Sequence, residues 1–210
     1  EEIMDVRHIH WLGHSSFRIE DGKSQIYLDP WKLPSGSPRA DLILITHGHS
    51  DHCSPDDVRN IAGTETVVAA TAEAAAKLKR KVEVVVAGQT YTLAGHAVEV
   101  VPAYNVGKSY HPRESGGVGY IITLSGGQRI YHAGDTDFIP EMQHIKADIA
   151  LLPCGGTYTM TAAEAAQAAS TFRPSIVIPM HWGDIIGSKK DAETLKQLFG
   201  GAVEIKNAVR

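Results

Sequence analysis

Thr46-His47-Gly48-His49-Ser50-Asp51-His52 directly follows the apolar run Leu42-Ile43-Leu44-Ile45 and precedes Ser54-Pro55-Asp56-Asp57. The apolar run predicts a buried strand. A helix is predicted to begin just after the histidine-rich stretch, because a serine N-cap, a proline at the first helical position and two acids in the first turn follow it. The stretch therefore lies in a turn between a strand and a helix, where loops often carry function.

Four metal-ligand side chains occur within six residues of this turn: His47, His49, Asp51 and His52. Alternate side chains of an extended segment share a side, so His47 and His49 can face one ion. The bend into the helix can turn Asp51 and His52 toward a neighbouring ion. Imidazoles with a carboxylate suit Zn²⁺, and less selectively Mn²⁺ or Fe²⁺, and the absence of thiolates argues against a closed structural zinc site.

The composition is that of an ordinary globular protein. The chain has 210 residues, 43% of them hydrophobic and 21% charged, and a net charge of −4. We predict a single domain over residues 1–210, large enough to bury its own core. The acidic balance and the absence of a basic arm argue against a nucleic-acid partner.

The two cysteines, Cys53 and Cys154, cannot form a disulfide framework and fit a reducing compartment, so we predict a cytoplasmic protein. No apolar stretch approaches the roughly 18 residues of a membrane span, and Glu1-Glu2-Ile3-Met4-Asp5 lacks the pattern of a signal peptide. We therefore expect no membrane partner. The edge strands of the predicted sheets could pair with a second copy of the chain, which leaves a homo-oligomer as an alternative to a monomer.

Short apolar or alternating runs alternate with helical stretches, which predicts an α/β (α+β) fold with helices packed outside two layers of sheet. The predicted strands cover residues 6–12, 16–20, 25–28, 42–46, 66–70, 82–86, 98–102, 119–124, 129–133, 149–152, 176–178 and 203–205. The predicted helices cover residues 55–62, 72–80, 139–145, 162–172 and 191–199. His96, in a predicted hairpin turn, is expected at the surface.

A thirteen-residue loop from Asn105 to Gly117 contains Lys108, His111 and Arg113. Polar loops of this length carry functional residues more often than they serve only as connections.

Three motifs together resemble the metallo-β-lactamase superfamily of metal-dependent hydrolases. They are His-x-His-x-Asp-His at 47–52, Tyr131-His132-Ala133-Gly134-Asp135-Thr136, and Ile178-Pro179-Met180-His181. Three further stretches are similar to the branch that contains the ascorbate-6-phosphate lactonases and uncharacterised prokaryotic metal-dependent hydrolases: residues 11–17, 26–30 and 155–160. The resemblance implies a four-layered αββα sandwich with metals at the sheet edges.

The resemblance also implies a ligand set for two divalent ions, with Zn²⁺ favoured and Mn²⁺ or Fe²⁺ as alternatives. The first ion would take His47, His49 and His111, the second would take Asp51, His52 and His181, and Asp135 would bridge them. The family places its third histidine just after an apolar strand, where this chain has Ala103-Tyr104-Asn105. His111 is the nearest histidine, and Asn105 or a water remains an alternative.

Ions about 3.5–4 Å apart can share a water and lower its pKa toward 7, which would generate a metal-bound hydroxide nucleophile. Asp51 could orient that hydroxide, and His132 is the second catalytic candidate, lying behind the metal ligands rather than among them. The predicted substrate contacts are His14, Lys108, Arg113 and Tyr158. The planar fork of Arg113 suits a carboxylate or phosphate.

We therefore expect a hydrolase that cleaves a small anionic ester, lactone or phosphodiester. One alternative is a metal-dependent nuclease or phosphodiesterase acting on RNA, since related tRNA 3′-end processing enzymes share these ligands. Another is a non-catalytic metal-binding protein of the same fold.

Overall fold

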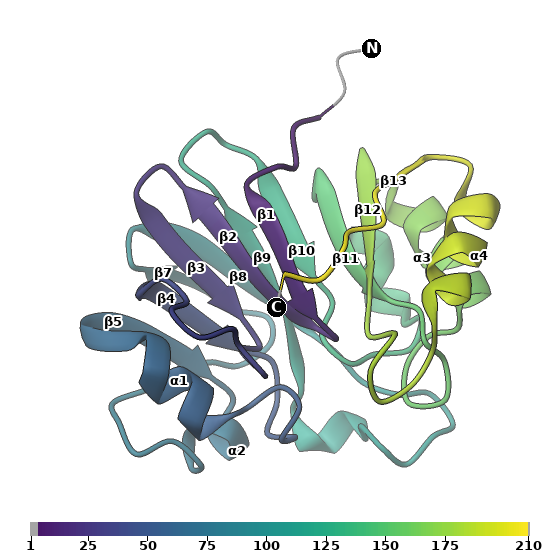
Figure 1. Cartoon of the computed structure of the whole chain (residues 1–210). Helices are drawn as coiled ribbons and strands as arrows, with labels where there is room; N and C mark the ends of the chain where they lie inside the picture. The colour runs from purple at the N-terminus through teal and green to yellow at the C-terminus, as the bar shows by residue number, and fades with distance from the viewer. Residues whose placement is uncertain (1–3, 210) are drawn as a thin grey trace.

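The computed structural model describes residues 4–209 and consists of two sheets that face one another (Figure 1). The six strands of the first sheet lie in the order β1 (Ile9–Gly13), β2 (Ser16–Asp21), β3 (Ser24–Leu28), β4 (Ala40–Ile45), β5 (Ala62–Ala70) and β6 (Glu83–Val84). The seven strands of the second lie in the order β13 (Ala202–Val203), β12 (Ile176–Met180), β11 (Ile149–Pro153), β10 (Arg129–His132), β9 (Val118–Thr123), β8 (His96–Pro102) and β7 (Thr90–Leu93).

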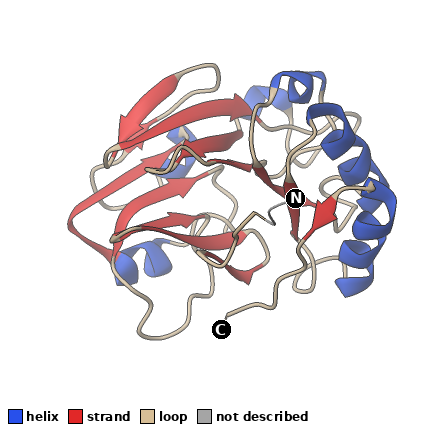
Figure 2. Ribbon diagram, turned by 90° about the horizontal axis from the view of Figure 1, so that it is seen from above, coloured by secondary structure: helices blue, strands red, loops and turns tan. Residues whose placement is uncertain are grey.

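Helices cover the outer faces of both sheets (Figures 1 and 2). Helices α1 (Pro55–Ile61) and α2 (Ala72–Ala75) pack on the first sheet, and α3 (Ala162–Phe172) and α4 (Lys189–Phe199) pack on the second. Two short 3₁₀ helices, η1 (Arg113–Ser115) and η2 (Pro140–His144), lie in the connections. The predicted α/β sandwich of four layers is confirmed.

The contacts of β4 explain why its last four residues, Leu42 to Ile45, are all apolar. Leu42 and Leu44 enter the core between the sheets, whereas Ile43 and Ile45 pack in the cluster that contains Val58 of α1. A strand that is buried on both faces needs a continuous apolar run rather than an alternating one.

The topology gathers the polar motifs at one edge of the sandwich. Strand β4 runs parallel to β3, and β10, β11 and β12 are mutually parallel. Parallel neighbours within one sheet end at the same edge. The edges of the two sheets adjoin, since His47 Nε2 lies 3.9 Å from Asp135 Oδ2. Asp29 follows β3, His47 follows β4, Asp135 follows β10 and His181 follows β12.

The structure corrects two of the predicted helices. The helix predicted over 72–80 ends at Ala75, after which Arg80 turns back to donate to the main-chain carbonyls of Gly63 and Thr66. The stretch 139–145 forms only the 3₁₀ helix η2.

Strand β7 was not predicted, and His96 is buried rather than at the surface. A two-residue turn with positive φ at Ala94 and Gly95 joins β7 to β8, the geometry that a tight hairpin needs. His96 then lies 3.0 Å from the Asp21 carboxylate.

None of the helices within residues 4–209 combines the length and apolar character of a bilayer span. Residues 1–3, part of the stretch used to predict that a signal peptide is absent, lie outside the described residues.

Candidate metal centre

The first cluster of ligand atoms comes from His47, His49 and His111, and these atoms lie within 4.8 Å of one another. His47 Nε2 is 3.1 Å from His49 Nδ1. His47 and His111 are buried, whereas His49 is exposed. The structure thus brings the loop histidine beside the two histidines of the turn.

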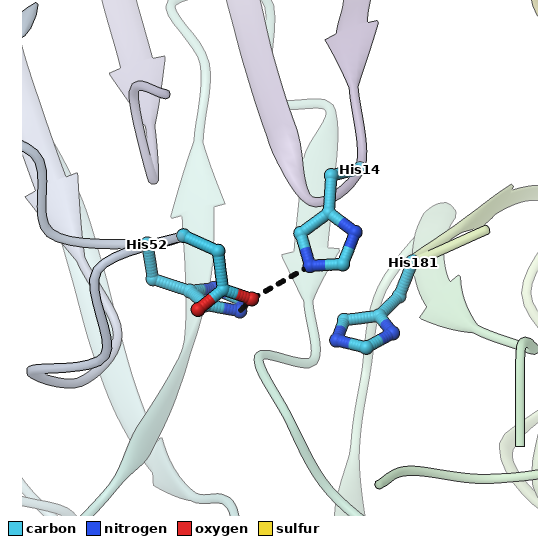
Figure 3. A group of neighbouring side chains, drawn as sticks. His14, His52 and His181 are labelled. Atoms are coloured by element: carbon cyan, nitrogen blue, oxygen red, sulfur yellow. Dashed lines mark hydrogen bonds and ion pairs between the residues drawn. The ribbon is translucent and has the colours of Figure 1, made fainter. Parts of the chain in front are cut away.

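The second cluster contains His14, Asp51, His52 and His181, whose ligand atoms also lie within 4.8 Å of one another. Figure 3 shows His14 and His181 reaching this cluster from different strands, with His52 opposite them. His14 Nε2 is 2.8 Å from Asp51 Oδ2. His14 was predicted to contact substrate; in the structure its ligand atom lies among those of the second cluster.

Asp135 lies between the two clusters. Its Oδ1 is 3.2 Å from His52 Nε2, and its Oδ2 is 3.2 Å from His111 Nε2 and 3.1 Å from His181 Nε2. The preceding Gly134 has φ +66°, and a Cβ there would lie 2.6 Å from the carbonyl oxygen of Val118. Glycine is therefore required for the tight turn that delivers the carboxylate.

Several buried polar atoms of the centre have no hydrogen-bond partner among the described residues. They are Nδ1 of His14, Nε2 of His52, Nε2 of His111, Oδ1 of Asp135 and Nδ1 of His181. Although His52 Nε2 and Asp135 Oδ1 are 3.2 Å apart, they lack hydrogen-bond alignment. Unpaired buried polar atoms are costly, and converging nitrogens and carboxylate oxygens fit a divalent cation.

The electrostatics of the centre also suit a cation. Burial lowers the pKa of His47, and to a lesser extent that of His49, so these imidazoles stay neutral as ligands must. Burial opposes ionisation of Asp135, but His181 and His52 outweigh it and hold its pKa well below the ordinary value. Burial likewise opposes a charge on His52, but Asp135 and Asp29 raise its pKa well above the ordinary value. The carboxylates that favour a proton there would also attract a metal ion.

Asp29 supports the ligands from behind, a role that sequence reasoning missed. It accepts hydrogen bonds from His52 Nδ1 (2.7 Å), the Thr46 main-chain N–H (2.8 Å) and the Thr46 hydroxyl (2.7 Å). His47 Nδ1 in turn lies 2.9 Å from that hydroxyl. Partners of this kind fix which imidazole nitrogen faces a metal. The signal was Asp29-Pro30 at the end of an apolar strand, next to the strand that carries the histidine motif.

His132 does not reach the centre. It is fully buried, its Nε2 is 2.8 Å from the main-chain oxygen of Ser15, and its Nδ1 accepts a hydrogen bond from the N–H of Gly134. Both ring nitrogens are therefore occupied by main-chain groups. The structure gives His132 a supporting place under the Gly134 turn instead of the catalytic one we predicted.

The predicted substrate contacts divide into two groups. Tyr158 lines a cavity beside Asp51 and His181, and its ring packs edge-on against Tyr110 with 4.7 Å between the ring centroids. Lys108 instead pairs with Asp137 at 2.6 Å, and Arg113 pairs with Glu141 at 3.0 Å.

Two small cavities open at the centre. One, of about 270 Å³, includes His47, His49, His111 and Glu73 among its lining residues. The other, of about 190 Å³, lies beside Asp51, Tyr158, His181 and Ile185. A larger cavity of about 460 Å³ at Thr64–Val68 has no histidine, cysteine or aspartate in its lining. We therefore assign the catalytic chemistry to the two smaller cavities at the metal centre.

Comparisons with known proteins agree with this geometry. Residues 8–181 match the model of the beta-lactamase superfamily domain. A UPF0173 metal-dependent hydrolase from Thermoplasma acidophilum is 36% identical, covering 94% of this chain and 92% of that protein, and one from Thermus thermophilus is 35% identical, covering 90% and 89%. The crystal structure of a putative metal-dependent hydrolase from Parabacteroides distasonis aligns with a TM-score of 0.84 at 37% identity, covering 94% of this chain and 91% of the other. The chain therefore belongs to the metallo-β-lactamase superfamily and, within it, to the UPF0173 metal-dependent hydrolase family.

Proposed function

We propose that this protein is a hydrolase that holds two divalent metal ions and uses a water activated between them to cleave a small ester, lactone or phosphodiester. The position of Asp135 carries the proposal. Its two carboxylate oxygens face histidines of both ligand clusters at 3.1–3.2 Å. A carboxylate so placed can serve two ions at once.

The ligand assignment follows from the two clusters. His47, His49 and His111 would hold the first ion, His14 or Asp51 with His52 and His181 would hold the second, and Asp135 would contact both. Bound ions would supply a nucleophile at neutral pH by lowering the pKa of water, and would offset negative charge that develops on the substrate. The nitrogen and carboxylate donor set favours zinc, with manganese or iron as alternatives.

Asp51 is suited to orient the attacking water rather than to deprotonate it. Burial opposes its ionisation, but the hydrogen bond from His14 and the imidazole of His52, whose Nε2 is 3.3 Å from Asp51 Oδ2, outweigh burial and hold the pKa of Asp51 well below its ordinary value. So acidic a carboxylate is a weak base, yet it stays ionised and can accept a hydrogen bond. Its side chain is 18% exposed, within reach of solvent in the cleft.

The cavities support a small substrate. They share His49, Tyr110, His111 and Asp135, so a molecule lying across both would pass directly over the ligand clusters. Lactones are included because the sequence motifs are similar to those of the ascorbate-6-phosphate lactonases. We propose that the ions recognise the negative charge of an anionic substrate, because the two basic side chains predicted for that task are already paired with carboxylates.

Apolar contact would come from the rim of the cleft, where Tyr110 is 47% and Ile185 is 50% exposed. We also propose a cytoplasmic location, in keeping with two free and buried cysteines.

A substrate panel tests the proposal. Protein loaded with Zn²⁺ or Mn²⁺ should hydrolyse at least one class among aryl esters, lactones and phosphodiesters, and Asp135→Ala should not. Metal content is measured on the same samples. Full metal occupancy without turnover of any class would contradict the proposal and favour a non-catalytic metal-binding protein, whereas cleavage of RNA alone would favour the nuclease.

A further inference from the structure

We propose that Asn105 is a positioning residue that makes His111 a ligand of the first metal ion. Asn105 and His111 are both buried, each with 7% of its surface exposed. Asn105 lies three residues beyond the end of β8, and His111 lies six residues further along the loop. The sequence left Asn105 itself open as the third ligand, and its hydrogen bonds argue for the other role.

Both polar atoms of the Asn105 side-chain amide form hydrogen bonds within the protein. Its Oδ1 accepts from the main-chain N–H of His111 at 2.9 Å and lies 3.0 Å from His111 Nδ1, while its Nδ2 donates to the Tyr158 carbonyl at 2.9 Å. The opposite orientation of the amide would set its N–H₂ group against the His111 N–H, donor to donor. The oxygen therefore faces His111, and both of its lone pairs are used.

This contact also selects the tautomer of His111. Because Nδ1 faces a carbonyl oxygen it must carry the proton, which leaves Nε2 unprotonated. Nε2 is the nitrogen that joins His47 and His49, lies 3.2 Å from Asp135 Oδ2 and has no aligned hydrogen-bond partner among the described residues. Asn105 thus aims the free nitrogen of the imidazole at the ligand cluster.

Main-chain hydrogen bonds also join Asn105 and His111. The N–H of Asn105 donates to the carbonyl of His111 at 2.8 Å, so the residues are joined in both directions. Between them, the Val106 N–H and Lys108 Nζ both contact the Asp137 carboxylate, and Lys108 also donates to the Thr159 carbonyl. Lys108 therefore holds the loop that presents His111. Loss of the Asn105 amide would leave the imidazole free to rotate.

Titration of the metal-free protein with Zn²⁺ tests the inference, with Co²⁺ absorption as a report on coordination. This test needs no substrate, so its failure is distinct from failure of the proposed function, although both rest on the same metal centre. Asn105→Ala should weaken one of the two binding events by about 10–100-fold, the usual effect of losing a hydrogen bond behind a metal ligand, and leave the other unchanged. Asn105→Asp should recover part of the affinity, because a carboxylate oxygen accepts the same two bonds from His111 but cannot donate to the Tyr158 carbonyl. Asn60→Ala, at an exposed position of α1, is the control and should bind as the wild type does.

A double-mutant cycle separates positioning from direct ligation. If Asn105 acts only through His111, the variant carrying both Asn105→Ala and His111→Ala should bind Zn²⁺ no more weakly than His111→Ala alone. A further loss in the double variant, or wild-type affinity in Asn105→Ala, would overturn the inference. Should Asn105→Ala fail to fold, Asn105→Gln replaces it, since it keeps the amide but displaces the oxygen by one methylene group. It should then weaken the same binding event, and wild-type affinity would again overturn the inference.

Discussion

The main-chain N–H of His181 donates a hydrogen bond of 2.9 Å to the carbonyl of His14, and both residues have positive φ, 58° and 52°. Their rings are 4.0 Å apart between centroids. His14 follows β1 of the first sheet and His181 follows β12 of the second, so this bond joins the two sheets at the metal edge. Left-handed backbone at histidine is sparsely populated, and such strain is concentrated at functional sites.

His14→Ala should weaken binding of the second ion by about 10–100-fold, because it removes both a ligand atom and the hydrogen bond to Asp51. Binding is measured by Zn²⁺ titration of metal-free protein. His144→Ala, at an exposed position of η2, is the matched control and should have no effect. Equal affinities in the two variants would show that His14 plays no part in the centre.

Asp29→Asn should weaken metal binding by a similar factor, about 10–100-fold. The amide cannot accept from His52 and from both groups of Thr46 at once, so the imidazoles of His52 and His47 lose their fixed orientation. The same titration measures the change. Retention of wild-type affinity would mean that main-chain packing alone orients these ligands.

The histidine-rich turn was predictable from its own sequence, because an apolar run precedes it and helix-start signals follow it. Asp135 and His181 were assigned from the resemblance to the metallo-β-lactamase superfamily. Strand topology alone does not bring them to His47, because β4 belongs to the first sheet and β10 and β12 belong to the second. Local signals gave the helix after Ser54, whose side chain accepts from the Asp57 N–H as expected of an N-cap.

What the sequence could not supply was the partner of each side chain in three dimensions. Lys108 and Arg113 look like substrate contacts until Asp137 and Glu141 are seen beside them. His132 shares a strand with the Gly-Asp turn, yet its ring nitrogens face main-chain groups. Such choices depend on long-range packing, which no local motif records.

Asp21 offers a test of stability away from the metal centre. Burial raises its pKa, but hydrogen bonds from Ser125, and then the contact with His96, outweigh burial and hold the pKa below its ordinary value. Asp21 ends β2 of the first sheet, whereas Ser125 and His96 belong to the second, so the carboxylate links the sheets. Asp21→Asn should lower the free energy of unfolding by about 1–3 kcal/mol at pH 7.

The difference in the free energy of unfolding between the wild type and Asp21→Asn should shrink as the pH falls. A carboxyl with a lowered folded-state pKa stabilises the protein fully above its unfolded pKa of about 3.9 and loses that contribution as pH falls through the folded value. Urea unfolding of wild type and Asp21→Asn should therefore differ at pH 7 and converge below about pH 4. A difference that does not change with pH would show that the charge of Asp21 is irrelevant.

Removal of metal should lower the thermal unfolding temperature. Nε2 of His52, Nε2 of His111 and Oδ1 of Asp135 are buried in the centre with no hydrogen-bond partner among the described residues, and an ion would satisfy them. Free metal at a hundredfold excess over its dissociation constant would stabilise the folded state by about 2.7 kcal/mol. Calorimetry of chelator-treated protein before and after Zn²⁺ addition checks this, and unfolding temperatures that coincide would contradict it.

The central claim, a centre for two ions bridged by Asp135, is tested most directly by the metal content of protein purified without added metal. The account predicts two equivalents per chain, falling toward one in His111→Ala and further in Asp135→Ala. A single equivalent that is unchanged in His111→Ala would contradict it and indicate a site for one ion.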